Sequence, residues 1–432
     1  MYFLKSLRNY FKEKHFFWFG VFFLGSAPTI SSLFFIFSTI HKLKFYKLYI
    51  KDRWNIPFVI STLLMVAGVL YIKFDNSFFL KSNDLWDSNL LILGLFNWIP
   101  FFIFFWSFQD FLKSKKDRYV CALLFISSNI PVLISGFGQY FFQWYGPTEL
   151  LNGLIVWYQR PLVYRSGMTG LFNNANYIGL WLNIIFPFLL IFIKVNQNNF
   201  CKKLFSILLS FLTLLAIVLT ASRSAWLCAS LTIFFCYFFI FKTKKFLNLI
   251  FIFILIFLIF AINYFPENSN YFIGKLTRNY EKLDITRLEI WRYTFINILK
   301  KPFFGWGSGS FPFLIEEIKG IWKGHPHNLF LELFFSYGVL VGSIILSTFY
   351  KIILVSFSKI FSKKTESGNY IDKAWFIGLF IILFSQLLDM QYFDFRISFS
   401  LWILLAGLKN IIQEKNFSYE EKTNNSKFFE NY

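Results

Sequence analysis

Charged residues are scarce in this sequence of 432 residues: they make up 15%, against about a quarter in an ordinary soluble domain. Hydrophobic residues make up 56%. Repeated apolar runs reach the roughly 20 residues that a helix needs to cross about 30 Å of hydrocarbon. A soluble domain would not need so many such runs, so we expect an integral membrane protein.

The sequence also lacks the motifs of several other classes. It contains neither GxxxxGK[ST] nor the Rossmann glycine fingerprint, so nothing indicates a protein driven by nucleotide binding or hydrolysis. Its four cysteines have no C-x-x-C spacing, which gives no sign of a disulfide or metal site. No internal repeat is obvious, which argues against transporters built from paired halves. Nor does a cleavage site follow the first apolar run, so we expect that run to stay in the protein.

Basic residues are in excess, and the formal net charge is +20. In a soluble protein this would favour nucleic-acid binding, but here Lys and Arg stand mostly in short loops between apolar runs, where they set orientation in the membrane. The loop 41–53 is basic and is predicted to be cytoplasmic. The next loop, 74–88, carries Asp75, Asp84 and Asp87 and is predicted to be external. We therefore expect membrane lipids, and no nucleic acid, as partners.

Ten apolar runs are consistent with loops that alternate between the cytoplasmic and the external side, with the basic loops all on the cytoplasmic side. They are Pro57–Tyr71, Leu90–Phe108, Val120–Phe137, Tyr177–Ile193, Leu204–Leu219, Ala225–Phe241, Phe246–Tyr264, Leu329–Tyr350, Ala374–Leu388 and Ile397–Leu408.

The first apolar run, Phe16–Ile40, is interrupted near its middle by Gly25–Pro28. Because the N-terminus is also basic, this alternation needs the run to turn back, as two short helices or a re-entrant pair. The alternative is a single first helix with the N-terminus outside. The first reading predicts an all-α polytopic fold of about 12 transmembrane helices with both termini cytoplasmic. Residues 1–414 would form one membrane domain with an external loop at 265–328, and 415–432 a polar cytoplasmic tail.

Two of the four histidines, His325 and His327, stand together at the end of the long external loop. A histidine at a membrane boundary can take a proton from a hydroxyl near neutral pH, as a glycosyl acceptor requires. Alone, such a histidine is more often an interfacial residue that caps the next helix.

Arginines occur at the same predicted face. Arg223 stands between two apolar runs, where a guanidinium is costly unless it is paired or lies in a water-filled cavity. It indicates either an anion site or a residue of a helix-hairpin turn whose side chain extends to the membrane interface. Arg287 and Arg292 stand in a stretch whose apolar residues follow helical spacing, which predicts an amphipathic helix on the membrane surface. Arg160 and Arg165 precede the segment Gly170–Asn176, which offers phosphate or sugar contacts or simply a helix start.

Five short motifs together resemble the O-antigen ligase and polymerase family of bacterial envelope glycosyltransferases. In chain order they are Gly170–Gly179, Ser222–Ala225, Thr286–Trp291, Lys301–Gly309 and His325–Asn328. The resemblance runs from about Arg160 to Ile345. One departure is Ala175, which stands where the family usually has a proline between two asparagines.

The resemblance implies a GT-C-like membrane enzyme of the bacterial inner membrane, with its active site facing the periplasm. The donor would be a polyprenyl-diphosphate-linked glycan, transferred with inversion and without a metal or cofactor. By position, Arg223 and Arg287 would bind the donor diphosphate, His327 would be the base and His325 its partner. The arginines Arg165 and Arg292 are further candidates for the diphosphate. The acceptor would be lipid A core for a ligase, another glycan for a polymerase, or a protein hydroxyl for an oligosaccharyltransferase.

Two other classes stay open from the residues. The arginines would also suit a transporter of an inorganic anion. A metal-dependent enzyme would instead use Asp75, Asp84 and Asp87, because carboxylate oxygens bind Mg²⁺ or Mn²⁺.

Overall fold

The computed structural model describes residues 13–74, 86–162, 167–241, 286–320, 322–362 and 369–414. Within these ranges the chain is almost entirely helical, and nine helical stretches are long and apolar enough to cross a membrane. The prediction of an all-α polytopic membrane protein is confirmed.

The helices are α2 (Glu13–Phe23), α3 (Pro28–Leu43), α4 (Tyr46–Lys51), α5 (Ile56–Phe74), α6 (Asn89–Phe96), α7 (Ile99–Phe108), η2 (Gln109–Phe111), α8 (Lys115–Phe142), α9 (Ala175–Val195), α10 (Phe200–Leu219), α11 (Arg223–Cys236), η3 (Tyr237–Phe241), α14 (Arg287–Lys300), α15 (Phe311–Lys319), α16 (Leu329–Phe361), α17 (Tyr370–Leu388) and α18 (Phe395–Gln413). Two short strands, β1 (Thr148–Leu150) and β2 (Ile155–Trp157), pair antiparallel.

The nine candidate spans correspond to nine of the ten predicted runs, and the other, Phe246–Tyr264, lies outside the described residues, as does the tail 415–432. The first run is broken, as predicted: α2 ends at Phe23, the chain turns, and α3 begins at Pro28 and packs back against α2. The alternative of one continuous first helix is therefore wrong.

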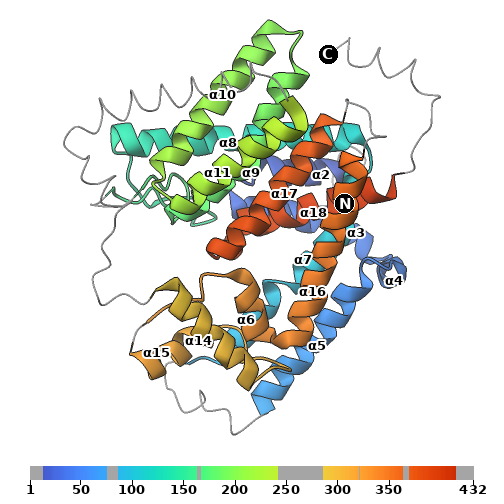
Figure 1. Ribbon diagram of the computed structural model, residues 1–432, viewed down its shortest axis with the longest axis vertical. Coiled ribbons are helices and arrows are strands. Elements are labelled where there is room, and N and C mark those ends of the chain that lie inside the picture. The colour runs from blue at the N-terminus through green and yellow to red at the C-terminus, as the bar shows by residue number, and fades with distance from the viewer. Residues whose placement is uncertain are drawn as a thin grey trace.

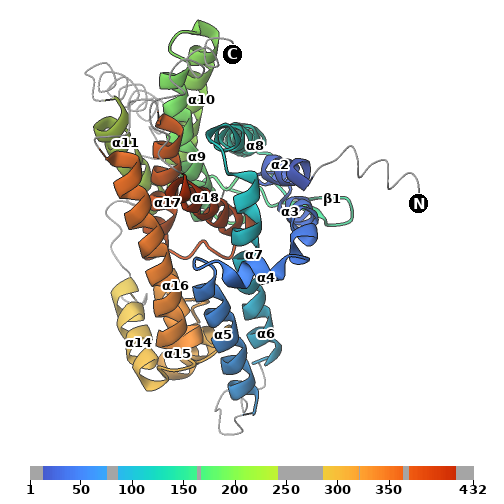
Figure 2. The same cartoon turned by 90° about the vertical axis from the view of Figure 1, so that its right-hand side faces the viewer.

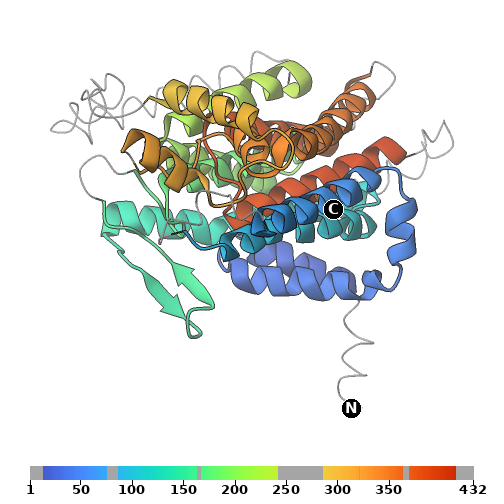
Figure 3. The ribbon, with the colours of Figure 1, turned by 90° about the horizontal axis from the view of Figure 1, so that it is seen from below.

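The helices form two groups joined by α16 (Figures 1 and 2). One group contains α8 to α11 with α17 and α18, and its central members α9 and α18 are the most buried spans. The other contains α5, α6, α14 and α15. The β-hairpin projects at one edge, beyond the end of α8 (Figure 3). It is attached to the turn between α2 and α3, because Trp157 Nε1 donates to Ser26 O at 2.8 Å.

The long helix α16 is broken at Gly338, whose φ of 84° and ψ of 170° are not helical. A helix break leaves backbone groups without partners, and in a membrane these must be satisfied by protein. The segment Lys301–Gly309 does this: Trp306 N donates to Phe335 O at 2.8 Å, and Val339 N donates to Pro302 O at 2.7 Å. A Cβ at Gly338 would lie 2.0 Å from Phe303 O, so only glycine fits.

Candidate active site

Four helices begin at the motifs noted in the sequence, and each has a side-chain cap. Asn174 caps α9, Ser222 caps α11, Thr286 caps α14 with a full capping box, and Asn328 caps α16. We call the region where these helices begin and α17 ends the motif end of the molecule. Because each cap fixes where its helix starts, it also fixes the residues beside it.

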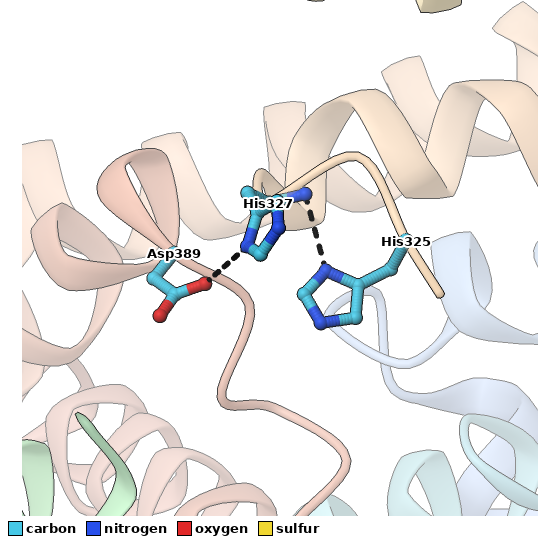
Figure 4. A group of neighbouring side chains, drawn as sticks. All are labelled: His325, His327 and Asp389. Carbon is cyan, nitrogen blue, oxygen red and sulfur yellow. Dashed lines mark hydrogen bonds and ion pairs between the residues drawn. The ribbon is translucent and has the colours of Figure 1, made fainter. Parts of the chain in front are cut away.

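The cap at Asn328 determines how the two histidines lie. Asn328 Oδ1 accepts bonds from Phe330 N at 3.0 Å and Leu331 N at 3.1 Å, so this asparagine, not a histidine, caps α16. His327 adopts a φ of 54°, which is uncommon for a non-glycine residue. Its backbone N donates to His325 Nδ1 at 3.2 Å, which holds the two rings together (Figure 4).

The partner of His327 is Asp389, which follows the last residue of α17. His327 Nδ1 lies 2.9 Å from Asp389 Oδ1, with the carboxylate 6% exposed and the imidazole 31% exposed (Figure 4). A ring held at Nδ1 by a carboxylate has a fixed orientation, and its other nitrogen, Nε2, is left for other contacts. The pair therefore resembles the arrangement of a histidine base and an orienting carboxylate.

Asp389 is held by two further donors. Asn176 Nδ2 donates to Oδ2 at 2.6 Å, and the backbone N of Met390 donates to Oδ1 at 2.9 Å. Burial alone would raise the pKa of this carboxyl. The hydrogen bond with His327, the electrostatic interactions with His327 and Arg287, and the bond from Met390 N hold the pKa of Asp389 below its ordinary value. Asp389 is therefore ionised at neutral pH.

His325 is electrostatically different. Burial, together with the charges of His327 and Arg287, lowers the pKa of His325 to about 4, although Asp389 opposes this. His325 is therefore neutral at physiological pH. It acts on His327 through the hydrogen bond it accepts.

The start of α11 is connected to the same carboxylate. Ser222 Oγ donates to Asn176 Oδ1 at 2.7 Å, and Asn176 in turn donates to Asp389. Arg223 is the next residue after Ser222 and its side chain is exposed. The hydrogen bonds therefore fix the backbone that carries the exposed side chain of Arg223.

Arg287 contacts the segment that carries Asp389. Its Nη1 donates to the backbone O of Leu388, the residue directly before Asp389. One turn further along α14, Trp291 Nε1 donates to Pro326 O at 3.0 Å, between the two histidines. Thus α14 touches both segments that carry the His–Asp pair.

The remaining predicted arginines are placed differently. Arg292 follows Arg287 by five residues, which turns it about 140° around α14 by helix geometry, and its side chain is exposed. Arg165 lies outside the described residues. The structure thus brings the helix starts that carry Arg223 and Arg287 to the Asp389 segment and the histidines, and Arg292 stands on another side of α14.

Sequence reasoning missed Asp389 and undervalued Asn176, which we expected chiefly to start a helix. Asp389 ends a run of apolar residues, where a carboxylate is costly and commonly functional, and that was the available signal. Among the described residues, His325, His327 and Asp389 also offer ligand atoms within 4.8 Å of one another, so these three groups could share a metal ion. Of the three aspartates considered as metal ligands, Asp75 and Asp84 lie outside the described residues.

Comparison with known proteins bears on the same residues. Residues 208–346 match the family model described as O-Antigen ligase, a range that includes Arg223, Arg287 and both histidines. Over 442 aligned residues the chain is 27% identical to the ComP-specific O-oligosaccharyltransferase of Acinetobacter baylyi (strain ATCC 33305 / BD413 / ADP1), covering 94% of this chain and 74% of that protein. With the nine apolar spans, these matches support the resemblance to the O-antigen ligase family that the motifs indicate.

Proposed function

We propose that this protein transfers a polyprenyl-diphosphate-linked glycan to an acceptor hydroxyl at the motif end, in the manner of an O-antigen ligase. The observation that carries the proposal is the His327–Asp389 pair with Arg287 beside it. The match of residues 208–346 to the O-antigen ligase family model and the relative named an O-oligosaccharyltransferase support the same reaction class. We place the site on the periplasmic face of the bacterial inner membrane, because the basic loops predict the opposite side to be cytoplasmic.

In this reaction His327 is the base. With Nδ1–H donated to the ionised Asp389, Nε2 carries the lone pair and accepts the proton of the acceptor hydroxyl. The oxygen attacks the anomeric carbon as the bond to the diphosphate breaks. Because base and leaving group act in a single displacement, the configuration at the anomeric carbon inverts. The imidazolium that forms is stabilised by Asp389.

The leaving diphosphate needs positive charge that is already in place. Arg223 and Arg287 stand at the starts of two different helices that are both connected to the Asp389 segment, and guanidinium groups bind phosphate oxygens in a bidentate manner. Charge preorganised around the departing phosphate lowers the barrier without a metal ion. We therefore propose a metal-independent transferase, and activity retained in a chelator tests this point.

Several acceptors fit this chemistry, because each supplies only a hydroxyl to His327. A ligase uses lipid A core, a polymerase uses a second glycan, and the relative's name supports a protein acceptor. Transfer assays with one donor and these three acceptors in turn identify which of them the chain uses.

The decisive experiment is transfer by purified protein carrying His327→Ala, with His41→Ala as the matched control. His41 is one of the four histidines but stands on α3, far along the chain from the motifs. We expect the first variant to lose transfer and the second to keep it. Full activity of His327→Ala removes the proposed base, and uptake of an inorganic anion into proteoliposomes without glycan turnover favours a transporter instead.

A further inference from the structure

Arg396 is a buried arginine that the proposed reaction does not use. It stands in the first turn of α18 and is 2% exposed. Within the part of the chain that the structure describes, its Nε and Nη1 have no hydrogen-bond partner. Its Nη1 lies 3.5 Å from Asp394 Oδ2. A charge buried with such weak pairing is costly, so its retention suggests a function.

The contacts of Arg396 join two segments. Its guanidinium carbon lies 3.9 Å from the centre of the Phe172 ring, and its Nη2 donates to Leu171 O at 3.4 Å. Phe172 is fully buried and belongs to the segment that leads into α9. Arg396 itself belongs to the start of α18, directly after the loop that connects it to α17. The cation–π contact therefore ties the entry of α9 to that loop.

The same two segments meet a second time in the active site. Asn176 follows Phe172 by four residues, and Asp389 precedes Arg396 by seven. Their 2.6 Å hydrogen bond connects the segments at the His–Asp pair. The Arg396–Phe172 contact and the Asn176–Asp389 bond therefore join the same two segments at two points.

We propose that Arg396 is a positioning residue: by clamping Phe172 and Leu171, it holds Asn176 against Asp389 and so keeps Asp389 aligned with His327. The expected effect of Arg396 on the rate of transfer rests on the proposed function, whereas its effect on the position of Asn176 and Asp389 does not. A displacement of about 1 Å remote from the reacting atoms can cost about a hundredfold in rate. The clamp thus acts on the rate of transfer, not on donor affinity.

The kinetic test compares Arg396→Met with the wild type. We expect kcat to fall about tenfold to a hundredfold, as for a small misplacement of catalytic groups, while KM for the donor is unchanged. In the background of Asn176→Ala the same substitution should have little further effect, because the contact through which it acts is already gone. A raised KM with unchanged kcat would make Arg396 a donor-binding residue and overturn the proposal.

Two phenylalanines provide a matched pair. Phe172 and Phe125 are both fully buried and both pack on Trp181, with ring centroids at 6.2 and 6.4 Å, but Phe172 is the one under Arg396. We expect Phe172→Leu to lower kcat as Arg396→Met does, and Phe125→Leu to lower only the thermal midpoint. Equal kcat losses in both leucine variants contradict a specific clamp.

A cross-linking experiment tests the geometry without catalysis. Asn176→Cys and Asp389→Cys are combined with Cys201→Ser, because Cys201 is exposed whereas the other three cysteines are buried. Mild oxidation should join the two introduced thiols efficiently, and adding Arg396→Met should remove most of that product. An unchanged yield overturns the clamp, even if His327→Ala has already confirmed the proposed transfer. A lower yield supports the clamp even if that variant stays active.

Discussion

The two ends of the helix bundle hold their charges differently. At the end opposite the motifs, where α8 and α17 begin and α18 ends, Arg118 is fully buried and pairs at 2.8 Å with both Asp372 and Glu414. At the motif end, Arg223 and Arg287 are exposed and form no ion pair with a carboxylate of the described residues. A buried arginine is thus neutralised by the chain's own carboxylates at one end, whereas two arginines stay exposed at the other.

The largest effect on activity should come from the carboxylate of the motif end. Asp389→Asn replaces the anion that holds His327 by a neutral amide, which no longer stabilises the imidazolium. General-base catalysis contributes about 10²–10⁴-fold, and we expect kcat to fall within that range. The measurement is transfer per mole of folded protein. A loss below tenfold would show that the pair does not act as a base and its orienting partner.

The corresponding change at the opposite end should affect stability instead. Arg118→Ala leaves Asp372 buried without its arginine, and breaking a buried pair in this way costs about 3–5 kcal/mol. We expect a large drop in the unfolding midpoint in detergent, with near-normal activity in the protein that remains folded. Should specific activity fall as strongly as for Asp389→Asn, the division between the two ends does not hold.

The exposed arginines should affect the donor more mildly. A hydrogen bond to a charged group contributes about 1.5–3 kcal/mol, so Arg223→Ala and Arg287→Ala should each raise KM for the donor by about tenfold to a hundredfold. Lysine at either position should restore only part of this, because it lacks the guanidinium fork. Arg292→Ala, on another side of α14, should have a smaller effect, and an equal effect would bring Arg292 into the site.

The smallest effect should be a pH dependence of stability from His325. Its pKa is about 4 when folded and 6.5 when unperturbed, so between these values the unfolded chain binds more protons. Stability from this group is complete above about pH 6.5 and is lost as the pH falls to about 4. In His325→Asn the unfolding midpoint should therefore fall less across this window. A parallel fall in both proteins would assign the acid sensitivity to other groups.

Hydropathy was sufficient to predict the spans, because a segment that crosses lipid must be apolar throughout its length. The break at Gly25–Pro28 was predictable for a local reason, since proline cannot continue a helix. The bond between His327 and Asp389 was not, because the residues are 62 positions apart and no local pattern relates them. Contacts of this kind come from tertiary packing alone.

The helix α14 was predicted, but its buried face was not. Leu288 and Phe295 belong to the apolar spacing that predicts a helix on the membrane surface, and they are 73% and 55% exposed, while the face packed on the protein includes Thr294 and Asn297. The polar pair can be buried because each bonds to its own helix: Thr294 Oγ1 to Ile290 O at 2.7 Å, and Asn297 Nδ2 to a backbone oxygen at 2.9 Å. Side-chain bonds within the helix thus allow this partly polar face to pack inward.

The break at Gly338 has a consequence for how the chain tolerates change. Since Trp306 and Gly307 donate to carbonyls before the break, and Val339 donates back to Pro302, the segment 301–309 is registered against α16 residue by residue. An inserted residue between Pro302 and Trp306 would shift this register, so variation in length should be absent there. The amide hydrogens of Gly307 and Val339 both take part in the bonds that join this segment to α16. If these bonds open together, the two hydrogens should exchange with solvent at the same rate.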